Sequence, residues 1–220
     1  MFKIIDLTRT ISTDMPGVAL DVARTIEKDG WNATTLHIYS HAGTHVDAPK
    51  HFGVPGKTVD EIPLTDFIGP AWMVDLEGLQ PRHLIELNDL GDLIETLQEG
   101  DSLVLKTGWS KYFYNKEYFR DQLPRIGEDL ANWCVSRKIK MLGVEPPSVA
   151  DVNNLEEVTR IHKILLSGGI RIVEGLTNLE SIQNSKFLLM VMPLKISGGD
   201  GAPARAFAIE GEGISGFTFK

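Results

Sequence analysis

The chain has 220 residues, of which 42% are hydrophobic and 24% are charged, which is usual for a globular protein with a sizeable core. Its formal net charge is −8 without a basic stripe, which argues against nucleic-acid binding. A strongly anionic substrate would therefore need a local basic pocket or a metal. The chain has one cysteine, Cys134, and its apolar runs are too short to span a bilayer, so we expect a cytoplasmic protein.

The apolar pattern along the chain predicts mixed α/β structure. The expected strands, marked by short apolar or alternating runs, are residues 3–7, 33–39, 71–76, 102–107, 140–145, 170–174, 187–191 and 204–209. The expected helices, marked by apolar residues three and four positions apart, are residues 81–98, 126–137 and 154–166. The alternation of strand and helix from residue 83 to 174 is typical of an α/β unit. We predict a single mixed α/β domain covering residues 1–220.

A histidine-rich stretch follows the second expected strand. His41, His45, Asp47 and His51 all fall on odd positions. Side chains of an extended segment alternate between two faces, so all four would project to one side. A helix is less favoured, because the stretch also contains a glycine, β-branched residues and a proline. Imidazoles and a carboxylate suit a divalent metal such as zinc, and three ligands with an open position are typical of a catalytic site. The alternative is a polar loop with surface histidines.

Two groups in the second half of the chain could complete such a site. His162 lies on the core-facing side of the helix expected at residues 154–166, and Glu174 ends a buried strand. Taken alone, His162 is more simply a core histidine with satisfied hydrogen bonds. A lone buried carboxylate is costly unless it is paired or metal-bound, and strand ends are where α/β proteins place ligands. Together the two residues are more consistent with metal ligands than with coincidence.

Other chemically active groups have simpler interpretations. The chain lacks HExxH, GxSxG and Walker motifs, and Cys134 on an apolar helix face is expected to be inert. The glycine-rich residues 197–201 are interpreted as a loop that could form a wall of the pocket. The aromatic residues within 112–119 favour a satellite core over a pocket lining. His37 and His83 are interpreted as surface residues, although His37 could also support a metal ligand.

Residues 41–51 read HAGTHVDAPKH, which matches the signature HxGTHxDxPxH. In this the chain resembles the cyclase family of metal-dependent hydrolases, which includes bacterial kynurenine formamidases and isatin hydrolases. Weaker blocks that are similar to the family follow in the expected order over nearly the whole chain, among them residues 106–109, 143–148 and 172–176. The resemblance implies a swivelling β/β/α fold and a homodimer or homotetramer.

The resemblance also implies roles for individual residues. The residues that would hold one or two divalent ions, zinc or manganese, are His41, His45, Asp47, His162 and Glu174. In two-metal members Asp47 would bridge the ions. His51 would be the proton donor and acceptor.

These roles predict a hydrolase that cleaves an amide bond of a small molecule, with a metal-bound water as the nucleophile and His51 as the acid and base. The activity would be arylformamidase-like, acting on C–N bonds other than peptide bonds. In the kynurenine branch it would belong to tryptophan catabolism.

One departure from the family bears on the substrate. Kynurenine formamidases carry a Trp-Pro-Gly-Asp turn near the start, whose aromatic side chain packs on the substrate ring. Here the turn is Met15-Pro16-Gly17-Val18, which makes Met15 a candidate substrate contact. The change mildly favours a lactam or lactone ring hydrolase of the isatin hydrolase type over N-formylkynurenine hydrolysis. A non-catalytic metal-binding protein on the same scaffold is the alternative from another class, and the intact His51 argues against it.

Overall fold

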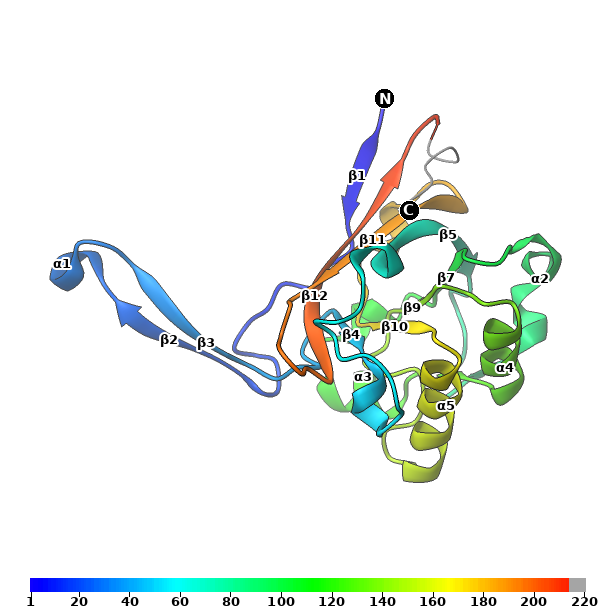
Figure 1. Cartoon of the computed structure of the whole chain (residues 1–220), viewed down its shortest axis with the longest axis horizontal. Helices are drawn as coiled ribbons and strands as arrows, with labels where there is room; N and C mark the ends of the chain where they lie inside the picture. Colours follow the sequence, from blue (N-terminus) through cyan, green and yellow to red (C-terminus); the bar gives the residue numbers. More distant parts are fainter. Residues whose placement is uncertain (214–220) are drawn as a thin grey trace.

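The computed structural model describes residues 1–213, which form both strands and helices (Figure 1). The strands are β1 (Lys3–Asp6), β2 (Val18–Arg24), β3 (Ala33–Ile38), β4 (His45–Asp47), β5 (Ile68–Asp75), β6 (Leu84–Ile85), β7 (Ser102–Lys106), β8 (Arg125–Ile126), β9 (Met141–Val144), β10 (Arg171–Glu174), β11 (Lys186–Pro193) and β12 (Gly201–Glu210). The α-helices are α1 (Ile26–Asp29), α2 (Leu93–Thr96), α3 (Lys116–Asp121), α4 (Glu128–Ser136) and α5 (Leu155–Ser167). The 3-10 helices are η1 (Pro49–Phe52), η2 (Leu64–Phe67), η3 (Leu87–Leu90), η4 (Trp109–Tyr112) and η5 (Leu179–Ser181).

One large sheet forms the body of the molecule. Its strands follow the order β1-β12-β11-β5-β7-β9-β10-β4, and β4 also pairs with β12. This second pairing closes every strand of the sheet except β1 into a barrel. The pairs β5–β7, β7–β9 and β9–β10 are parallel, whereas the remaining pairs are antiparallel. The mixed α/β class predicted from the sequence is confirmed.

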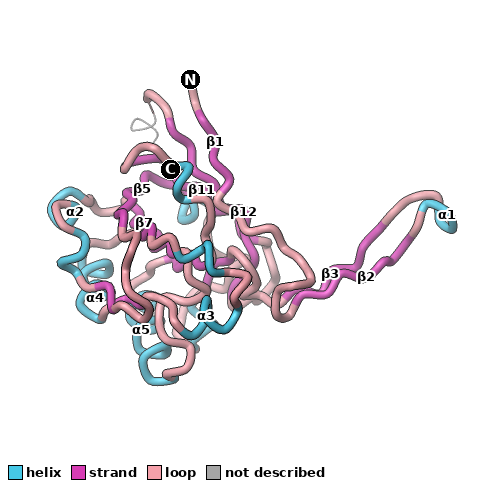
Figure 2. The backbone as a smooth tube through the Cα atoms, turned by 180° about the vertical axis from the view of Figure 1, so that it is seen from behind, coloured by secondary structure: helices cyan, strands magenta, loops and turns pink. Residues whose placement is uncertain are grey.

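The two faces of the barrel wall carry two separate apolar clusters. Val104 and Val173 belong to the cluster inside the barrel, to which strands from around the whole circuit contribute. Their neighbours Leu105 and Ile172 point the other way and pack in a second cluster with residues of α4 and α5. This alternation is the period of two that a strand imposes. Helices α4 and α5 therefore cover the outer face of the parallel strands, on the side of the body away from the β2–β3 hairpin (Figures 1 and 2).

A two-stranded hairpin, β2 and β3 with α1 at its tip, projects from the body (Figure 1). Its residues are exposed or half-buried along its whole length. The exposed apolar side chains on it include Leu20, Val22, Ile26, Trp31 and Leu36. An isolated hairpin is at best marginally stable in water, so this arm has an unsatisfied apolar surface.

The helix expected at residues 81–98 is wrong. Leu84 and Ile85 instead form β6, which pairs with β8. Glu86 then caps η3 through a reciprocal pair of hydrogen bonds with Asp89. Gly91 ends that turn with a φ of 54°, a conformation that no helix continues through. Leucine spacing alone predicted one helix, but strand pairing and capping divide the segment into short pieces.

Most of the other long elements agree with the sequence, but the strand β2 was not predicted. Helices α4 and α5 match two expected helices to within two residues at each end. Tyr112, Phe113, Tyr118 and Phe119 pack in a third cluster around Trp109, as expected for a satellite core, whereas Tyr114 is exposed. Phe113 and Phe119 also line a cavity, which was the alternative interpretation. Within residues 1–213, helices long and apolar enough to cross a membrane are absent.

Cys134 offers a direct test of the packing beneath α4. Its side chain is fully buried, and burial raises the pKa of its thiol to about 12. We expect the native protein to leave Ellman's reagent unreacted at mildly alkaline pH, because the reactive thiolate is scarce and shielded. In concentrated guanidinium chloride the chain should release one equivalent of chromophore, and Cys134→Ser should release none. Rapid reaction of the native protein would contradict this packing.

Candidate metal centre

Strand β4 positions the first group of site residues. It pairs with β10 on one edge and β12 on the other, in a register that sets His45 opposite Glu174. Val46 packs inside the barrel, so His45 and Asp47 project outward, toward α5. The expected extended run from 41 to 51 is wrong outside residues 45–47. His41 enters from a bend before β4, and His51 lies on η1 after it. The chain nevertheless brings all four side chains together.

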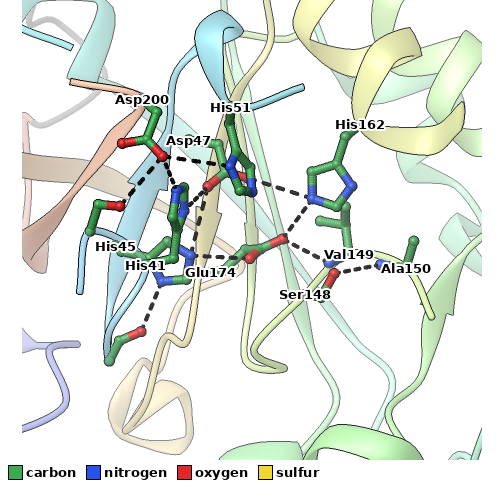
Figure 3. Close-up of polar contacts among 12 residues, drawn as sticks. His41, His45, Asp47, His51, Ser148, Val149, Ala150, His162, Glu174 and Asp200 are labelled. Carbon is green, nitrogen blue, oxygen red and sulfur yellow. Dashed lines mark hydrogen bonds and ion pairs between the residues drawn. The ribbon is translucent and has the colours of Figure 1, made fainter. Parts of the chain in front are cut away.

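Helix α5 and strand β10 supply the rest of the cluster (Figure 3). His162 Nε2 lies 3.5 Å from Asp47 Oδ2 and 3.4 Å from Glu174 Oε1. His45 Nε2 lies 3.2 Å from Glu174 Oε2. All four residues are buried. The structure therefore joins His162 and Glu174 to the histidine stretch.

Three histidines of the cluster are oriented by a hydrogen bond through one ring nitrogen. His45 Nδ1 bonds to the Gly43 carbonyl at 3.0 Å, and His162 Nδ1 to the Val158 carbonyl at 2.7 Å. His41 Nε2 bonds to Asp200 Oδ2 at 3.0 Å, and its Nδ1 faces Asp47 Oδ1 at 2.8 Å. The Nδ1 bonds of His45 and His162 turn the other ring nitrogen toward the cluster, which is how metal-bound histidines are usually held, whereas His41 bonds to a carboxylate through each nitrogen.

A close backbone approach supports this arrangement. The Gly43 carbonyl that accepts from His45 lies where a side chain at position 175 would project, and a Cβ there would come 2.3 Å from the oxygen. Gly175 also has a φ of 70°. Glycine at position 175 is thus required both by space and by backbone conformation.

The charges of the cluster favour a cation. Burial alone would raise the pKa of Glu174, but His162 and His45 outweigh it and lower that pKa. Burial would likewise lower the pKa of His41, but Asp47 and Asp200 raise it to about 9. The pKa values of His45 and His162 are also raised, because the carboxylates outweigh burial. These carboxylates therefore hold protons on the imidazoles where a metal ion could replace them.

His51 differs from the other three histidines. Its ring stacks on that of His41, with centroids 3.7 Å apart, and its Nδ1 lies 3.8 Å from Asp200 Oδ2, beyond hydrogen-bond distance. Within residues 1–213 its ring nitrogens make no hydrogen bond. Burial lowers the pKa of His51, and the charges of His41 and His162 lower it further against the pull of Asp47. The ring is thus neutral at pH 7 and free to accept a proton.

Asp200 was not identified as a site residue from the sequence. It belongs to the glycine-rich loop 197–201, which was interpreted only as a pocket wall. Its Oδ2 accepts from His41 and also lies 3.4 Å from Ser40 Oγ. An acidic residue between glycines, placed just before β12, was the available signal, but the pairing of β12 with β4 that brings it to His41 cannot be read from the sequence.

The residues present fit a divalent ion. Two groups of three ligand atoms, each group within 4.8 Å, share Asp47: one is His41, His45 and Asp47, and the other is Asp47, His162 and Glu174. Asp47 Oδ2 and His45 Nε2 are buried without a hydrogen bond. Unsatisfied buried atoms of these types are costly unless a cation uses them. A third group, His41, His51 and Asp200, is only partly buried.

Two adjoining cavities open onto the cluster. One, of about 360 Å³, is lined by His41, His45, His51, His162 and Glu174 among others. The second, of about 220 Å³, is lined mainly by apolar groups, including the buried Met15. Tyr39, His41, Arg120 and Pro147 belong to both walls. A substrate could therefore reach the carboxylates and histidines from an apolar chamber.

The remaining histidines lie elsewhere. His37 is exposed on the hairpin, where its Nε2 lies 3.1 Å from Asp21. His83 is half-buried, and its buried Nε2 lies 3.5 Å from Asp89, so its interpretation as a surface residue is wrong in part. His37 agrees with its interpretation as a surface residue, and neither histidine belongs to the candidate ligand groups among residues 1–213.

Comparison with known proteins agrees with this geometry. The family model described as "Putative cyclase" matches residues 5–151. A kynurenine formamidase of Bacillus cereus is 30% identical over 209 residues, which cover 92% of this chain and 95% of that protein. A kynurenine formamidase of Salinibacter ruber is 28% identical, with the same coverage of 92% and 95%.

Solved structures share the fold. An isatin hydrolase bound to the product analogue thioisatinate superposes with a TM-score of 0.86 at 22% identity, covering 96% of this chain and 93% of that one. A potential metal-dependent hydrolase with cyclase activity superposes with a TM-score of 0.77 at 29% identity, covering 96% and 100%. The fold, the motif and the family match agree, and the chain belongs to the cyclase family of metal-dependent hydrolases.

Proposed function

We propose that this protein hydrolyses the amide bond of a small aryl formamide, as an arylformamidase-like enzyme acting on C–N bonds other than peptide bonds. The observation that carries the proposal is the pair of ligand groups sharing Asp47, beside a histidine whose ring nitrogens are free. Kynurenine formamidases as relatives support N-formylkynurenine as the substrate and a place in tryptophan catabolism.

The residues of the proposed site have two roles, metal binding and proton transfer. Bound divalent ions would polarise the substrate carbonyl and lower the pKa of a water toward neutral. His41, His45, Asp47, His162 and Glu174 are the proposed ligands. We propose zinc, with manganese as the alternative, because imidazole and carboxylate suit both ions.

His51 is the proposed acid and base. It lines the cavity that contains the ligand groups, and its lowered pKa keeps the ring neutral at pH 7. As water attacks the amide carbonyl, His51 takes its proton, and it then gives this proton to the leaving amine as the C–N bond breaks. The hydrogen bonds of the other three histidines support the division, because anchored rings suit ligands and a free ring suits proton transfer.

Ring opening of a lactam or lactone, as in isatin hydrolases, is the second candidate. The specific observation that favours it is Met15, which presents a thioether to the apolar cavity in place of an aromatic ring. Met15 is proposed to contact the substrate in either case. Assays on formanilide, N-formylkynurenine, isatin and simple lactones separate the candidates. A protein that binds metal but hydrolyses none of them would be a metal-binding protein on the same scaffold.

We further propose that residues 1–220 form one catalytic domain and that the protein is a cytoplasmic homodimer or homotetramer. The exposed apolar side chains of the β2–β3 hairpin support self-association, because a second copy could cover them. The single, buried cysteine is compatible with a reducing compartment.

Metal content tests the ligand assignment. We expect one ion for each of the two groups that share Asp47. Glu174→Gln should lose one of them and Asp47→Asn should lose both, because Asp47 belongs to both groups. Elemental analysis of purified protein gives the count, and a chelator should lower the melting temperature of the wild type. Glu180→Gln, which changes an exposed glutamate, is the matched control. Full metal content in Asp47→Asn would overturn the assignment.

The role of His51 is tested by separating turnover from metal binding. His51→Ala should lower kcat by roughly 10² to 10⁴-fold, the usual range for a general acid and base, while metal content stays at the wild-type level. His83→Ala removes a histidine outside the site and should keep both. Loss of metal together with activity would make His51 a ligand of the third, partly buried group instead.

We predict that the apolar side chains of the β2–β3 hairpin lie in the oligomer interface. Trp31→Glu combined with Leu36→Glu should convert the wild-type oligomer to monomer, because burying either carboxylate in an interface is unfavourable. Light scattering after size-exclusion chromatography measures the mass. Lys28→Glu at the hairpin tip changes charge without removing an apolar group and should leave the oligomer intact. A monomeric wild-type protein would contradict the proposal.

A further inference from the structure

The smaller, apolar cavity beside the metal centre carries an unusual balance of charge. Among residues 1–213, three cationic residues line it, Arg9, Lys116 and Arg120, and no acidic residue does. The chain as a whole has 30 acidic and 22 basic side chains, so a local surplus of three cations runs against its composition. A concave wall of one charge sign raises the local concentration of a ligand of the opposite sign.

Two of these cations come from one face of α3. Lys116 and Arg120 are four positions apart, which places them one above the other on a helix. Phe119 beside them is buried and lines the same cavity. The face thus offers one aromatic surface and two positive charges to the same space.

Arg9, near the N-terminus, lines the cavity together with α3 from the middle of the chain. Its guanidinium carbon lies 4.0 Å from the centre of the Phe113 ring, and its Nη2 donates to the Ser110 carbonyl at 3.2 Å. Its Nε is buried without a hydrogen bond. Stacking and one carbonyl bond hold the guanidinium in place without neutralising its charge.

Acidic groups of the protein leave these charges largely available. Glu145 is the buried carboxylate whose charge acts on Arg9, but one of its oxygens already accepts from Thr107 and Trp109. Arg120 lies 3.5 Å from the half-buried Asp121 and donates to Asn153 at 3.2 Å, which leaves further guanidinium donors unused. The side chain of Lys116 makes no hydrogen bond or ion pair with residues 1–213.

We propose that this cavity is a subsite for an anionic aryl substrate, in which the ring packs on Phe119 and Met15 while a carboxylate on the substrate binds Lys116 and Arg120. The cavity measures about 220 Å³. An apolar cavity of about 150 Å³ accommodates benzene in another protein, so this space holds one substituted ring. Because Arg120 lines both cavities, a carboxylate held there lies in the same connected space as the candidate metal ligands. This inference rests on the proposed amide hydrolysis and specifies its substrate class.

The test compares acidic and neutral substrates of the same shape. The substrates are the ortho, meta and para isomers of N-formylaminobenzoate, each paired with the matching carboxamide, which keeps the shape and removes the charge. We expect kcat/KM of the metal-loaded enzyme to favour at least one acid over its carboxamide by about tenfold, the effect of one charge-assisted hydrogen bond. The preference should shrink as salt is added, because screening weakens exposed charges.

Variants assign the preference to α3. In Lys116→Met and Arg120→Met the ratio of the two kcat/KM values should fall toward one, and a general loss of activity cancels in this ratio. Lys57→Met removes an exposed lysine that lines neither cavity and should keep the wild-type ratio. A wild-type ratio near one for all three isomers, or a preference that survives in Lys116→Met/Arg120→Met, would overturn the subsite.

A binding measurement keeps the subsite separate from the proposed reaction. If the enzyme hydrolyses none of the formamides, the amide hydrolysis fails while the subsite is still tested with benzoate and benzamide in calorimetry. Benzoate should then bind more tightly than benzamide, and the Lys116→Met/Arg120→Met variant should lose this difference. Equal benzoate affinity in the wild type and the double variant would place the carboxylate on the metal and reject the subsite.

Discussion

The pairing of β4 on both of its edges is the constraint on which the site depends. This strand has three residues, yet it bonds to β10 and β12 and so closes the barrel. A one-residue slip would turn His45 and Asp47 into the barrel and Val46 out of it, because strand faces alternate. Two neighbours bonded at once make such a slip unfavourable. The pairing that closes the barrel therefore also positions His45 and Asp47 of the first candidate ligand group.

The candidate metal centre lies on the outer side of that wall, beneath α5, and its buried charged groups are unfavourable for the stability of the fold. Asp47, Glu174 and two histidines are buried at distances where carboxylates and imidazoles depend on each other for charge balance. Replacing a cluster of this kind with apolar residues often stabilises a protein. Asp47 Oδ2 and His45 Nε2 have charged neighbours at 3.5 and 3.2 Å but make no hydrogen bond within residues 1–213. Such an arrangement favours a cation-binding role over a stabilising one.

The sequence predicted the parts of the molecule that local chemistry determines. Buried apolar runs and helical periodicity identified the parallel strands and α4 and α5, and residue type identified the candidate ligands. The prediction failed where a distant partner decides the conformation. Within the 81–98 segment, β6 pairs with β8 instead of forming a helix. Asp200 lies beside His41 only because β12 pairs with β4. Arg9 and Arg120 are likewise 111 residues apart, so their shared cavity has no signature along the chain.

The candidate site also divides into residues that determine the reaction and residues that would contact the rest of the substrate. All the candidate ligands except His41, which precedes β4, belong to the barrel wall and α5, where a change of position would break pairing or packing. The walls that would contact the rest of a substrate come from other segments, the early turn with Met15 and the short helix α3. Segments of this kind can change without disturbing the wall. The histidine motif therefore identifies the kind of reaction, whereas the molecule that reacts is decided by residues outside the motif, among them Lys116 and Arg120.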